Sequence, residues 1–440
     1  MAEIQTIAPV RHGWQGEVEI PGDKSISHRS VMFAGLGNTS VHIRHFLHAA
    51  DCLSTVGVMR ALGVDVEFLN ENELIVTGKG LHGLTEPMTV LDAGNSGTTL
   101  RLMMGLLAPQ PFLSTFCGDA SLTRRPMARV LLPLSQMGAK IYGRNANKNL
   151  PLTIVPTAEK LRGIRYESPV ASAQVKSAIL LAGLYADAPT TVTEPYVSRD
   201  HTEQMLAGFG VHLERTGTSV TVFPVEEGSY RAPDEITVPG DISSAAYFLV
   251  AGTIIEGSRL LLKNVGINPT RTGILDVLTE MGADIRLQNE RTSGGERMAD
   301  IIVASASLRG ISFGAEIMPR LIDEIPVIAV AALFAEGDTV ITGAGELRVK
   351  ETDRLHAIAE EFQKLAPGSV EEQEDGLIIH GKTEIRQAQV SSWGDHRMAM
   401  SLAVLGAAAE GVRIEEPDSV NISYPRFFSE MECLSKGGSL

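Results

Sequence analysis

The strongest constraint on the fold of this chain is a pattern that recurs six times along its 440 residues. Each copy begins with a short polar stretch and continues into an apolar run rich in small residues. The copies begin near residues 25, 95, 172, 243, 323 and 395, so successive starts lie about 70 to 80 residues apart. Weak self-similarity at a fixed period indicates one supersecondary unit used repeatedly, and the sequence therefore predicts six copies of one unit.

A second signal keeps the same spacing. Apolar stretches end in a glycine once in each of the first four copies, at Gly63, Gly138, Gly210 and Gly282. Glycine is favoured just after a helix because it adopts left-handed backbone angles without strain. The first copy is expected to contain strand 16–20, helix 25–36, strand 40–44, helix 51–62 and a hairpin of strands 64–68 and 73–77, which makes a βαβαββ unit.

The length of the chain favours two domains, because single cores rarely grow this large. The tripeptide Pro-Gly-Asp occurs at residues 21–23 and again at 239–241, and we place the two chain crossovers there. One predicted domain combines residues 1–20 and 239–440, and the other spans residues 21–238. Each would be an α/β domain of three βαβαββ repeats with helices inside and sheets outside. The helix N-termini, which favour anions, are expected to meet at an active site in the interdomain cleft.

Composition narrows the classes of partner. A formal charge of −15 argues against a nucleic-acid or anionic membrane surface, although it leaves room for a local basic site. Cys52, Cys117 and Cys433 have neither metal-site nor disulfide spacing, which is typical of a protein in a reducing compartment. The first 14 residues lack the apolar core of a signal peptide. We therefore expect a cytoplasmic protein, a monomer that binds small molecules and neither nucleic acid nor membrane.

Polar residues at the first helix start suggest an anion site. Lys24, Ser25 and Arg29 suit phosphate or carboxylate, whereas His28 is better explained as a hydrogen-bonded structural histidine. The stretch is not a phosphate loop of the Walker type, because Asp23 separates the glycine from the lysine. Similar polar starts recur along the chain, and for each of them a simple helix cap remains an alternative. The candidate residues there are Asn95, Gly97, Arg125, Ser172, Gln174, Arg199, His396 and Arg397.

Two later segments bring acidic groups to the predicted site. Asp323 leads into an apolar helix, where it could be an N-cap or a general base in an anion-binding cleft. Lys350, Glu351 and Arg354 are spaced to share one face of a helix, as a surface ion-pair ladder or as site residues.

The motifs together resemble the enolpyruvyl transferase family across nearly the whole chain, and specifically the branch that acts on shikimate 3-phosphate. Ala173 and residues 198–203 are similar to the subgroup often called class II. A lysine that many members carry just before the pair Tyr424 and Pro425 is absent here. The segments that carry the resemblance are residues 22–29, 94–99 with Arg101, 125–126, 172–174, 348–354 and 395–400.

The resemblance implies transfer of an enolpyruvyl group from phosphoenolpyruvate to shikimate 3-phosphate, without a metal or an organic cofactor. This reaction needs a base, an acid and cations, and we assign Asp323 as the base, Glu351 as the acid and Lys24 as the cation nearest the reacting centre; the sequence leaves open which carboxylate moves which proton. The resemblance also implies that the family inhibitor glyphosate occupies the phosphoenolpyruvate position, next to Gly97. By the same resemblance shikimate 3-phosphate would contact Lys24, Ser25, Arg29, Ser172, Ala173, Gln174, Arg199, Asp323 and Lys350. Phosphoenolpyruvate would contact Lys24, Gly97, Arg125, Gln174, Arg354 and Arg397, with Asn95 and His396 at the same pocket.

Two other functions remain open at this point. One is the related transferase that acts on UDP-N-acetylglucosamine, which would carry asparagine at the position of Ser25 and a reactive loop cysteine, for which Cys117 is the only nearby candidate. The other is a binding module that kept the repeat and lost turnover. The joint presence of Lys24, Asp323 and Glu351 argues against such a module.

Overall fold

The structure, a computed structural model, describes residues 4–226 and 228–437. Contacts divide these residues into two units. Unit 1 comprises the residues up to Pro21, Gly240–Arg291 and the residues from Arg297 onward, and unit 2 comprises Gly22–Pro239 and Thr292–Glu296. Each unit has a hydrophobic core of its own, so the two are described separately.

Unit 2 repeats one sequence of elements three times: a buried helix, a strand, a second helix and a hairpin, with one further short strand for each repeat. Its elements are α1 (Lys24–Gly35), β3 (Ser40–Arg44), α2 (Ala50–Ala61), β4 (Asp65–Asn70), β5 (Glu73–Thr77), β6 (Leu91–Asp92), α3 (Gly97–Leu107), β7 (Ser114–Cys117), α4 (Ala120–Arg124), α5 (Ala128–Gln136), β8 (Lys140–Gly143), α6 (Arg144–Asn147), β9 (Asn149–Val155), β10 (Arg165–Glu167), α7 (Ala173–Gly183), β11 (Thr190–Thr193), α8 (His201–Gly208), β12 (Leu213–Thr216), β13 (Ser219–Val222) and β14 (Glu235–Thr237).

Unit 1 follows the same plan with more irregular connections. Its elements are β1 (Ile4–Ile7), β2 (Gln15–Glu19), α9 (Ile242–Ile254), β15 (Arg259–Gly266), α10 (Gly273–Met281), β16 (Asp284–Ser293), β17 (Glu296–Ala304), β18 (Ser312–Phe313), α11 (Met318–Leu321), η1 (Ile322–Glu324), α12 (Ile325–Phe334), β19 (Asp338–Ile341), η2 (Gly345–Val349), α13 (Arg354–Leu365), β20 (Val370–Glu372), β21 (Leu377–His380), β22 (Gln389–Ser391), α14 (His396–Ala408), β23 (Val412–Glu415), η3 (Pro417–Ile422) and α15 (Phe427–Ser435). The hairpin between β16 and β17 has its tip in unit 2.

The sheets share one topology, which confirms the repeat inferred from the sequence. Each four-stranded sheet contains one pair of parallel neighbours; in three sheets a helix joins the two strands, and in the other two sheets the strands come from distant parts of the chain. The other two strands form a hairpin. The later strand of this hairpin pairs antiparallel with the inner strand of the parallel pair. The strand orders are β14-β3-β5-β4, β6-β7-β9-β8 and β10-β11-β13-β12 in unit 2, and β16-β17-β15-β2, β18-β19-β21-β20 and β1-β23-β22 in unit 1.

The strand expected at residues 16–20 does not open the first repeat. It joins the domain of residues 239–440, as the predicted domain boundaries require, because β2 pairs in parallel with β15 of unit 1. Its place in the first sheet of unit 2 is taken by β14, which pairs in parallel with β3. The N-terminal strand β1 likewise completes the last sheet by pairing antiparallel with β23. The ends of each unit are therefore tied into sheets by strands that are remote in sequence.

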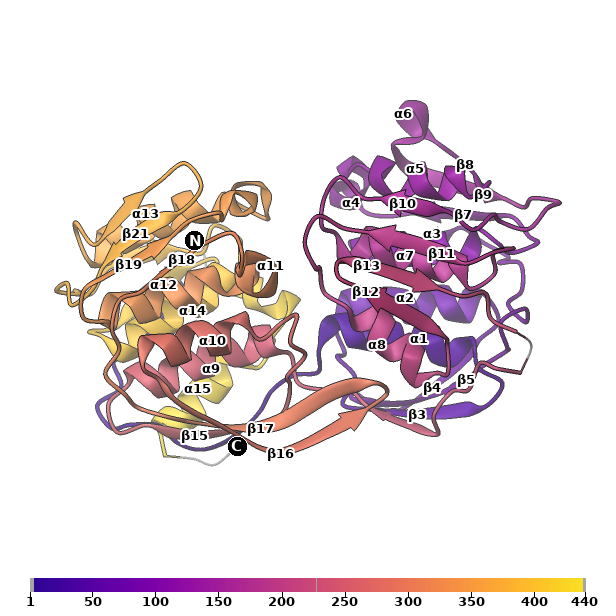
Figure 1. Ribbon diagram of the computed structural model, residues 1–440. Helices are drawn as coiled ribbons and strands as arrows, with labels where there is room; N and C mark the ends of the chain where they lie inside the picture. Colours follow the sequence, from indigo (N-terminus) through magenta and orange to yellow (C-terminus); the bar gives the residue numbers. More distant parts are fainter. Residues whose placement is uncertain (1–3, 227, 438–440) are drawn as a thin grey trace. The chain divides into compact units, whose positions relative to one another are not determined.

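The most buried helices lie inside each unit, with the sheets around them (Figure 1). In unit 1, α9, α12 and α14 pack on one another. Every residue of α12 from Ile325 to Leu333 is buried, as expected for a helix that is apolar all round. In unit 2, α3 packs on α1 and α7 in the same way. The helix-ending glycines predicted from the sequence are confirmed, since Gly63, Gly138, Gly210 and Gly282 have φ angles of 90°, 101°, 81° and 105°.

Within the described part of the chain, no helix combines the length and the apolar character needed to cross a bilayer.

Candidate active site

The starts of the buried helices in unit 2 hold most of the predicted anion ligands. Asp23 caps α1 by accepting the backbone N–H of Ile26 at 2.9 Å. Ser96 caps α3, and Ser172 caps α7 with a longer bond of 3.5 Å to the N–H of Val175. The capping alternative is thus confirmed for Ser172. These caps hold the first helical residues at the positively polarised ends of α1, α3 and α7.

An arginine cluster, defined here as Arg101, Arg125 and Arg129, lies beside the start of α3. Arg101 donates from Nη1 to Oε1 of Gln174 at 2.6 Å, and Arg125 donates from Nη2 to Oδ1 of Asn95 at 2.9 Å. Burial lowers the pKa of Arg101 to about 10, and the charges of Arg125 and Arg129 act in the same direction. A guanidinium surrounded by like charges is stabilised by an anion, so this cluster is suited to phosphate or carboxylate.

The two cations of α1 differ in their surroundings. Lys24 is partly exposed and pairs with Asp51 of α2 at 3.1 Å. Arg29 is only 3% exposed and donates to the hydroxyls of Thr202 at 2.7 Å and Ser177 at 3.0 Å. Burial lowers its pKa to about 10, and the nearby charge of Arg199 also lowers it. Arg29 therefore ties α1 to α7 and α8, while Lys24 remains available to a ligand.

His28 is a structural histidine, as the sequence suggested. Its ring Nδ1 is 2.6 Å from the hydroxyl of Thr55, which in turn lies 2.7 Å from the hydroxyl of Thr99. The chain of bonds continues from Thr99 to the cap residue Ser96 at 2.8 Å. Burial lowers the pKa of His28 to about 3, so the ring is neutral at physiological pH. The network links α1, α2 and the start of α3.

This burial predicts a specific acid sensitivity. The pKa of His28 is about 3 in the folded state and near 6.5 when unfolded, so below pH 6.5 the unfolded chain binds more protons. Stability should therefore fall as the pH drops below 6.5, by up to about 1.4 kcal/mol per pH unit from this one group. Urea unfolding of the wild type and of His28→Gln between pH 7 and pH 5 tests this. The variant should show the shallower decline, whereas parallel curves would contradict a neutral His28.

In unit 1, Asp323 lies among cations. Its carboxylate is 3.5 Å from Arg354, 3.8 Å from Lys350 and 3.8 Å from Arg397. Its side chain is 13% exposed. The N-cap alternative is wrong, because Asp323 lies in the turn η1 and α12 begins two residues later without a side-chain cap. Three positively charged side chains therefore lie within 3.8 Å of this carboxylate.

Arg354 is the most buried cation of this cluster, at 1% exposed. It donates from Nε to Asp395 at 2.7 Å and from Nη2 to Glu351 at 2.7 Å. Burial is the largest single effect and would raise the pKa of Asp395 and of Glu351, but the charge of Arg354 and backbone hydrogen bonds together outweigh it, so both pKa values are lowered. We call Asp323, Glu351, Arg354, Asp395 and Arg397 the carboxylate cluster.

The start of α14 adds His396 and Arg397. Burial lowers the pKa of His396 to about 4, and the neighbouring Arg397 lowers it too, so the imidazole is neutral at pH 7. Burial disfavours the charge of Arg397, but Asp323 and Glu324 overcome it and raise its pKa above the ordinary value. Arg397 also donates from Nη1 to the backbone oxygen of Asp323 at 3.3 Å. A permanent cation and a neutral base thus lie at one helix start.

The expected helical face of Lys350, Glu351 and Arg354 is wrong. Helix α13 begins only at Arg354, where Asp353 caps it through the N–H of His356. Lys350 and Glu351 lie before the helix, and the contact between Glu351 and Arg354 forms without helical spacing to support it. The segment Thr352–Asp353 was the available sequence signal, since an aspartate just before an apolar-periodic run is a typical helix start.

The structure brings the predicted residues together in two groups. Lys24, Ser25, Arg29, Asn95, Gly97, Arg125, Ser172, Ala173, Gln174 and Arg199 belong to unit 2, and Asp323, Lys350, Glu351, Arg354, His396 and Arg397 belong to unit 1. Arg129 was missed as a member of the clusters, and Arg101 and Asp395 were noticed only as parts of motifs. Among the residues that the structure describes, no group of three or more histidines, cysteines or acids is arranged to hold a metal ion.

Comparisons with known proteins find similar chains. Residues 10–431 match the family model described as EPSP synthase (3-phosphoshikimate 1-carboxyvinyltransferase). Proteins named 3-phosphoshikimate 1-carboxyvinyltransferase from Bacillus cereus (strain 03BB102) and Bacillus anthracis (strain A0248) are each 52% identical over 433 residues. Each alignment covers 98% of this chain and 99% of the relative.

Solved structures are similar as well. A structure of EPSP synthase from Acinetobacter baumannii has a TM-score of 0.91 and 41% identity, and the match covers 100% of this chain and 99% of that one. The enolpyruvyl transferase NikO from Streptomyces tendae has a TM-score of 0.77 at 17% identity, over 99% and 98% of the two chains, which supports the fold alone. The predicted fold class, the enolpyruvyl transferase fold, is confirmed. The match along nearly the whole chain, in family model and relatives alike, shows that this chain belongs to the EPSP synthase family.

Proposed function

We propose that the chain transfers the enolpyruvyl group of phosphoenolpyruvate to the 5-hydroxyl of shikimate 3-phosphate. The hydroxyl oxygen bonds to C2 of phosphoenolpyruvate and loses its proton, while C3 takes up a proton and becomes a methyl group. The tetrahedral intermediate then loses phosphate from C2 and a proton from C3. The products are 5-enolpyruvylshikimate 3-phosphate and inorganic phosphate.

The observation that supports this reaction most directly is the position of Asp323. A base for the hydroxyl must be ionised at neutral pH and close to the cations that bind the anionic substrates. Asp323 lies within 3.8 Å of Lys350, Arg354 and Arg397. Those cations stabilise its charged form, and their fixed charges would also stabilise the phosphate that leaves. A carboxylate and its cations in this arrangement can take a proton and hold an anion.

The substrates are assigned to the two groups of residues by chemistry. Arg125, Arg354 and Arg397 would bind the carboxylate and phosphate of phosphoenolpyruvate, with Lys24, Gly97 and Gln174 around them and Asn95 and His396 beside them. Shikimate 3-phosphate would bind to Lys24, Ser25, Arg29, Ser172, Ala173, Gln174, Arg199, Asp323 and Lys350. Arg29 would act from a buried position, through the hydroxyl-bonded guanidinium described above.

Glu351 can act as an acid only if it is protonated when the substrate is bound. Its pKa is lowered although burial would raise it, because Arg354 and a backbone hydrogen bond together outweigh burial, so without ligand Glu351 is a carboxylate and cannot donate a proton. If phosphoenolpyruvate binds Arg354, the 2.7 Å contact between Arg354 and Glu351 loses its donor. The pKa of Glu351 would then rise, and the acid would form only when the substrate is present.

The rival reading as a UDP-N-acetylglucosamine transferase has little support. It requires a reactive cysteine, and Cys117 at the end of β7 is the candidate. Burial raises the pKa of Cys117, and the carboxylate of Asp92 raises it further. Because the thiolate is the nucleophile, a raised pKa makes this thiol a poor one.

The proposal also places the chain in the cytosol, because Cys52, Cys117 and Cys433 form no disulfide in the described part of the chain, as is usual in a reducing compartment. The expected monomer stays a prediction.

A coupled assay for phosphate release tests the proposed function. Phosphate should appear only when phosphoenolpyruvate and shikimate 3-phosphate are both present. Replacement of shikimate 3-phosphate by UDP-N-acetylglucosamine should abolish release. Release with the nucleotide sugar instead would favour the rival transferase, and no release with either acceptor would favour a binding module.

Gly97 gives a prediction about inhibition. A methyl group at Gly97 would lie 2.6 Å from Nη1 of Arg101 and 3.6 Å from Nη1 of Arg125, so Arg101 would have to shift away from Gln174. If glyphosate occupies the phosphoenolpyruvate position and is the longer ligand, Gly97→Ala should raise its inhibition constant by about 10- to 100-fold, and the Michaelis constant for phosphoenolpyruvate by less.

Gly57→Ala is the matched control for this substitution. Gly57 also lies inside a helix, α2, and a methyl group there would meet nothing within 4 Å. Both constants should stay at their wild-type values in the control. Equal shifts of both constants in Gly97→Ala would show that the added methyl does not discriminate between the inhibitor and the substrate.

A further inference from the structure

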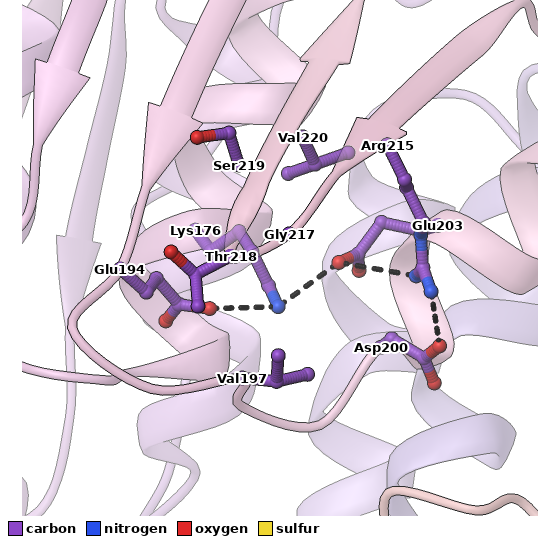
Figure 2. A pocket seen from close by; sticks show the side chains of 10 residues that line it. All are labelled: Lys176, Glu194, Val197, Asp200, Glu203, Arg215, Gly217, Thr218, Ser219 and Val220. Carbon is purple, nitrogen blue, oxygen red and sulfur yellow. Dashed lines mark hydrogen bonds and ion pairs between the residues drawn. The ribbon is translucent and has the colours of Figure 1, made fainter.

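A buried charge network that the proposed reaction steps do not use lies in unit 2 (Figure 2). Lys176 of α7 is 2.9 Å from Glu194 and 2.9 Å from Glu203, and all three side chains are at most 4% exposed. Arg215 extends the network by pairing with Asp200 at 2.7 Å and with Glu203 at 3.5 Å. Removing this many charges from water costs desolvation free energy, so such a network is weak evidence for a purely stabilising role.

The network borders a cavity of about 30 Å³. A space of this size holds one water molecule, and neither proposed substrate could enter it. Lys176 therefore does not bind a substrate directly. We therefore infer the role of the network from the backbone groups to which its members form hydrogen bonds.

Glu194 is the member that reaches out of the network. Its Oε1 accepts the backbone N–H of Ser172 at 2.8 Å. Its Oε2 accepts the hydroxyl of Ser198 at 2.8 Å and the backbone N–H of the same residue at 3.3 Å. Ser172 is the cap of α7, and Ser198 directly precedes Arg199. One carboxylate thus joins the two segments of unit 2 that carry Ser172, Gln174 and Arg199.

Lys176 holds Glu194 in this position, because its ammonium group lies 2.9 Å from Oε2 of Glu194. Glu203, the second carboxylate on Lys176, pairs with Lys176 and Arg215 rather than with Ser172 or Ser198. Burial raises the pKa of Glu203, against the effects of Lys176 and Arg215.

We propose that Glu194, held in place by Lys176, is a positioning residue for shikimate 3-phosphate. It fixes the distance between the start of α7 and the segment that carries Arg199, so that both meet one ligand. This inference rests on the proposed function. The affinity for the acceptor substrate then depends on a residue that itself contacts no substrate.

Titration calorimetry with shikimate 3-phosphate alone tests the role of Glu194. Glu194→Gln keeps the size of the side chain, but its amide nitrogen cannot accept a hydrogen bond and would face a donor. The dissociation constant for shikimate 3-phosphate should rise by about 10- to 100-fold, the usual cost of a misplaced binding group. The Michaelis constant for phosphoenolpyruvate, measured at saturating shikimate 3-phosphate, should change by less than about threefold.

Glu203→Gln is the matched control, because it removes the same charge from the same lysine without touching Ser172 or Ser198. Its dissociation constant should stay within about threefold of wild type, although its unfolding temperature should fall, as a buried partner of Lys176 is lost. Ser198→Ala removes one hydrogen bond from Glu194 and should weaken binding by about 3- to 10-fold.

The outcomes are separable. Equal dissociation constants for Glu194→Gln and Glu203→Gln would overturn the positioning role, while wild-type turnover would leave the proposed function standing. If Glu194→Gln does not fold, unchanged binding by Ser198→Ala overturns it. A wild type that neither binds shikimate 3-phosphate nor turns over would contradict the proposed function itself.

Discussion

Replacement of Asp323 by asparagine should lower the turnover number by about 10²- to 10⁴-fold, the usual range for loss of a positioned base. Asparagine has nearly the same size, so the packing around η1 is kept while the proton acceptor is lost. The neighbouring cations, Lys350, Arg354 and Arg397, remain in place to bind anions. The dissociation constant for shikimate 3-phosphate should therefore change much less than the turnover number, and steady-state kinetics with calorimetry measure both.

Asp338→Asn is the control for Asp323→Asn. Asp338 is an acid of the same unit that pairs with His380, is 59% exposed and lies on β19. Its loss should leave turnover unchanged. Near-normal turnover of Asp323→Asn would move the base role elsewhere. Lys24 and His396 would be next, the latter because its lowered pKa, about 4, keeps the imidazole neutral.

Replacement of Arg354 by methionine should destabilise the protein by about 3 to 5 kcal/mol, the usual cost of breaking a buried ion pair from one side. Arg354 is 1% exposed, and the side chain of its partner Asp395 is fully buried. Methionine fills part of the volume but leaves Asp395 without a cation, while Glu351 loses its 2.7 Å contact. Urea unfolding measures the free energy.

The loss from Arg354→Met should shrink at low pH. The pKa of Asp395 is lowered in the folded protein, so the stability it provides is present above its unfolded pKa and disappears as the pH falls. Arg297→Met is the control, since Arg297 forms a half-exposed pair with Glu290 and its loss should cost less than about 1 kcal/mol. A similarly small loss for Arg354→Met would contradict the account of the carboxylate cluster.

The sequence predicted the repeat well because each copy carries local signals. A polar cap followed by small apolar residues marks a buried helix, and a glycine after a helix marks its end. Helices α1, α3 and α7 accordingly begin within two residues of their expected starts, and β3 has the expected bounds. Strands β6, β10, β14, β18 and β22 were not expected, because two or three residues are too few to show an alternating pattern.

The pairing between strands that are distant along the chain could not be predicted from the sequence either. β14 pairs with β3, and β2 pairs with β15, across long stretches of chain that no local pattern connects. The listing of β2 with the first repeat failed for this reason, although its assignment to the domain of residues 239–440 is correct. Neighbouring elements are adjacent in space often enough to make the wrong pairing the natural expectation.

For the site, residue types were easier to predict than their environments. Arginines and acids in polar helix starts indicated an anion site, and the resemblance to a family supplied their roles. Sequence could not show that Arg354 is buried between Asp395 and Glu351, or that burial keeps His28 and His396 neutral. Such properties depend on desolvation and on charges from other elements, which only the packed structure specifies.

The most direct test of the central claim is ³¹P and ¹H nuclear magnetic resonance of a reaction mixture. The purified chain would be incubated with phosphoenolpyruvate and shikimate 3-phosphate. We predict that the phosphoenolpyruvate signal is replaced by inorganic phosphate and by the vinyl protons of an enol ether on shikimate 3-phosphate, in equal amounts. Formation of pyruvate and phosphate without the enol ether, or unchanged substrates, would contradict the proposed transfer.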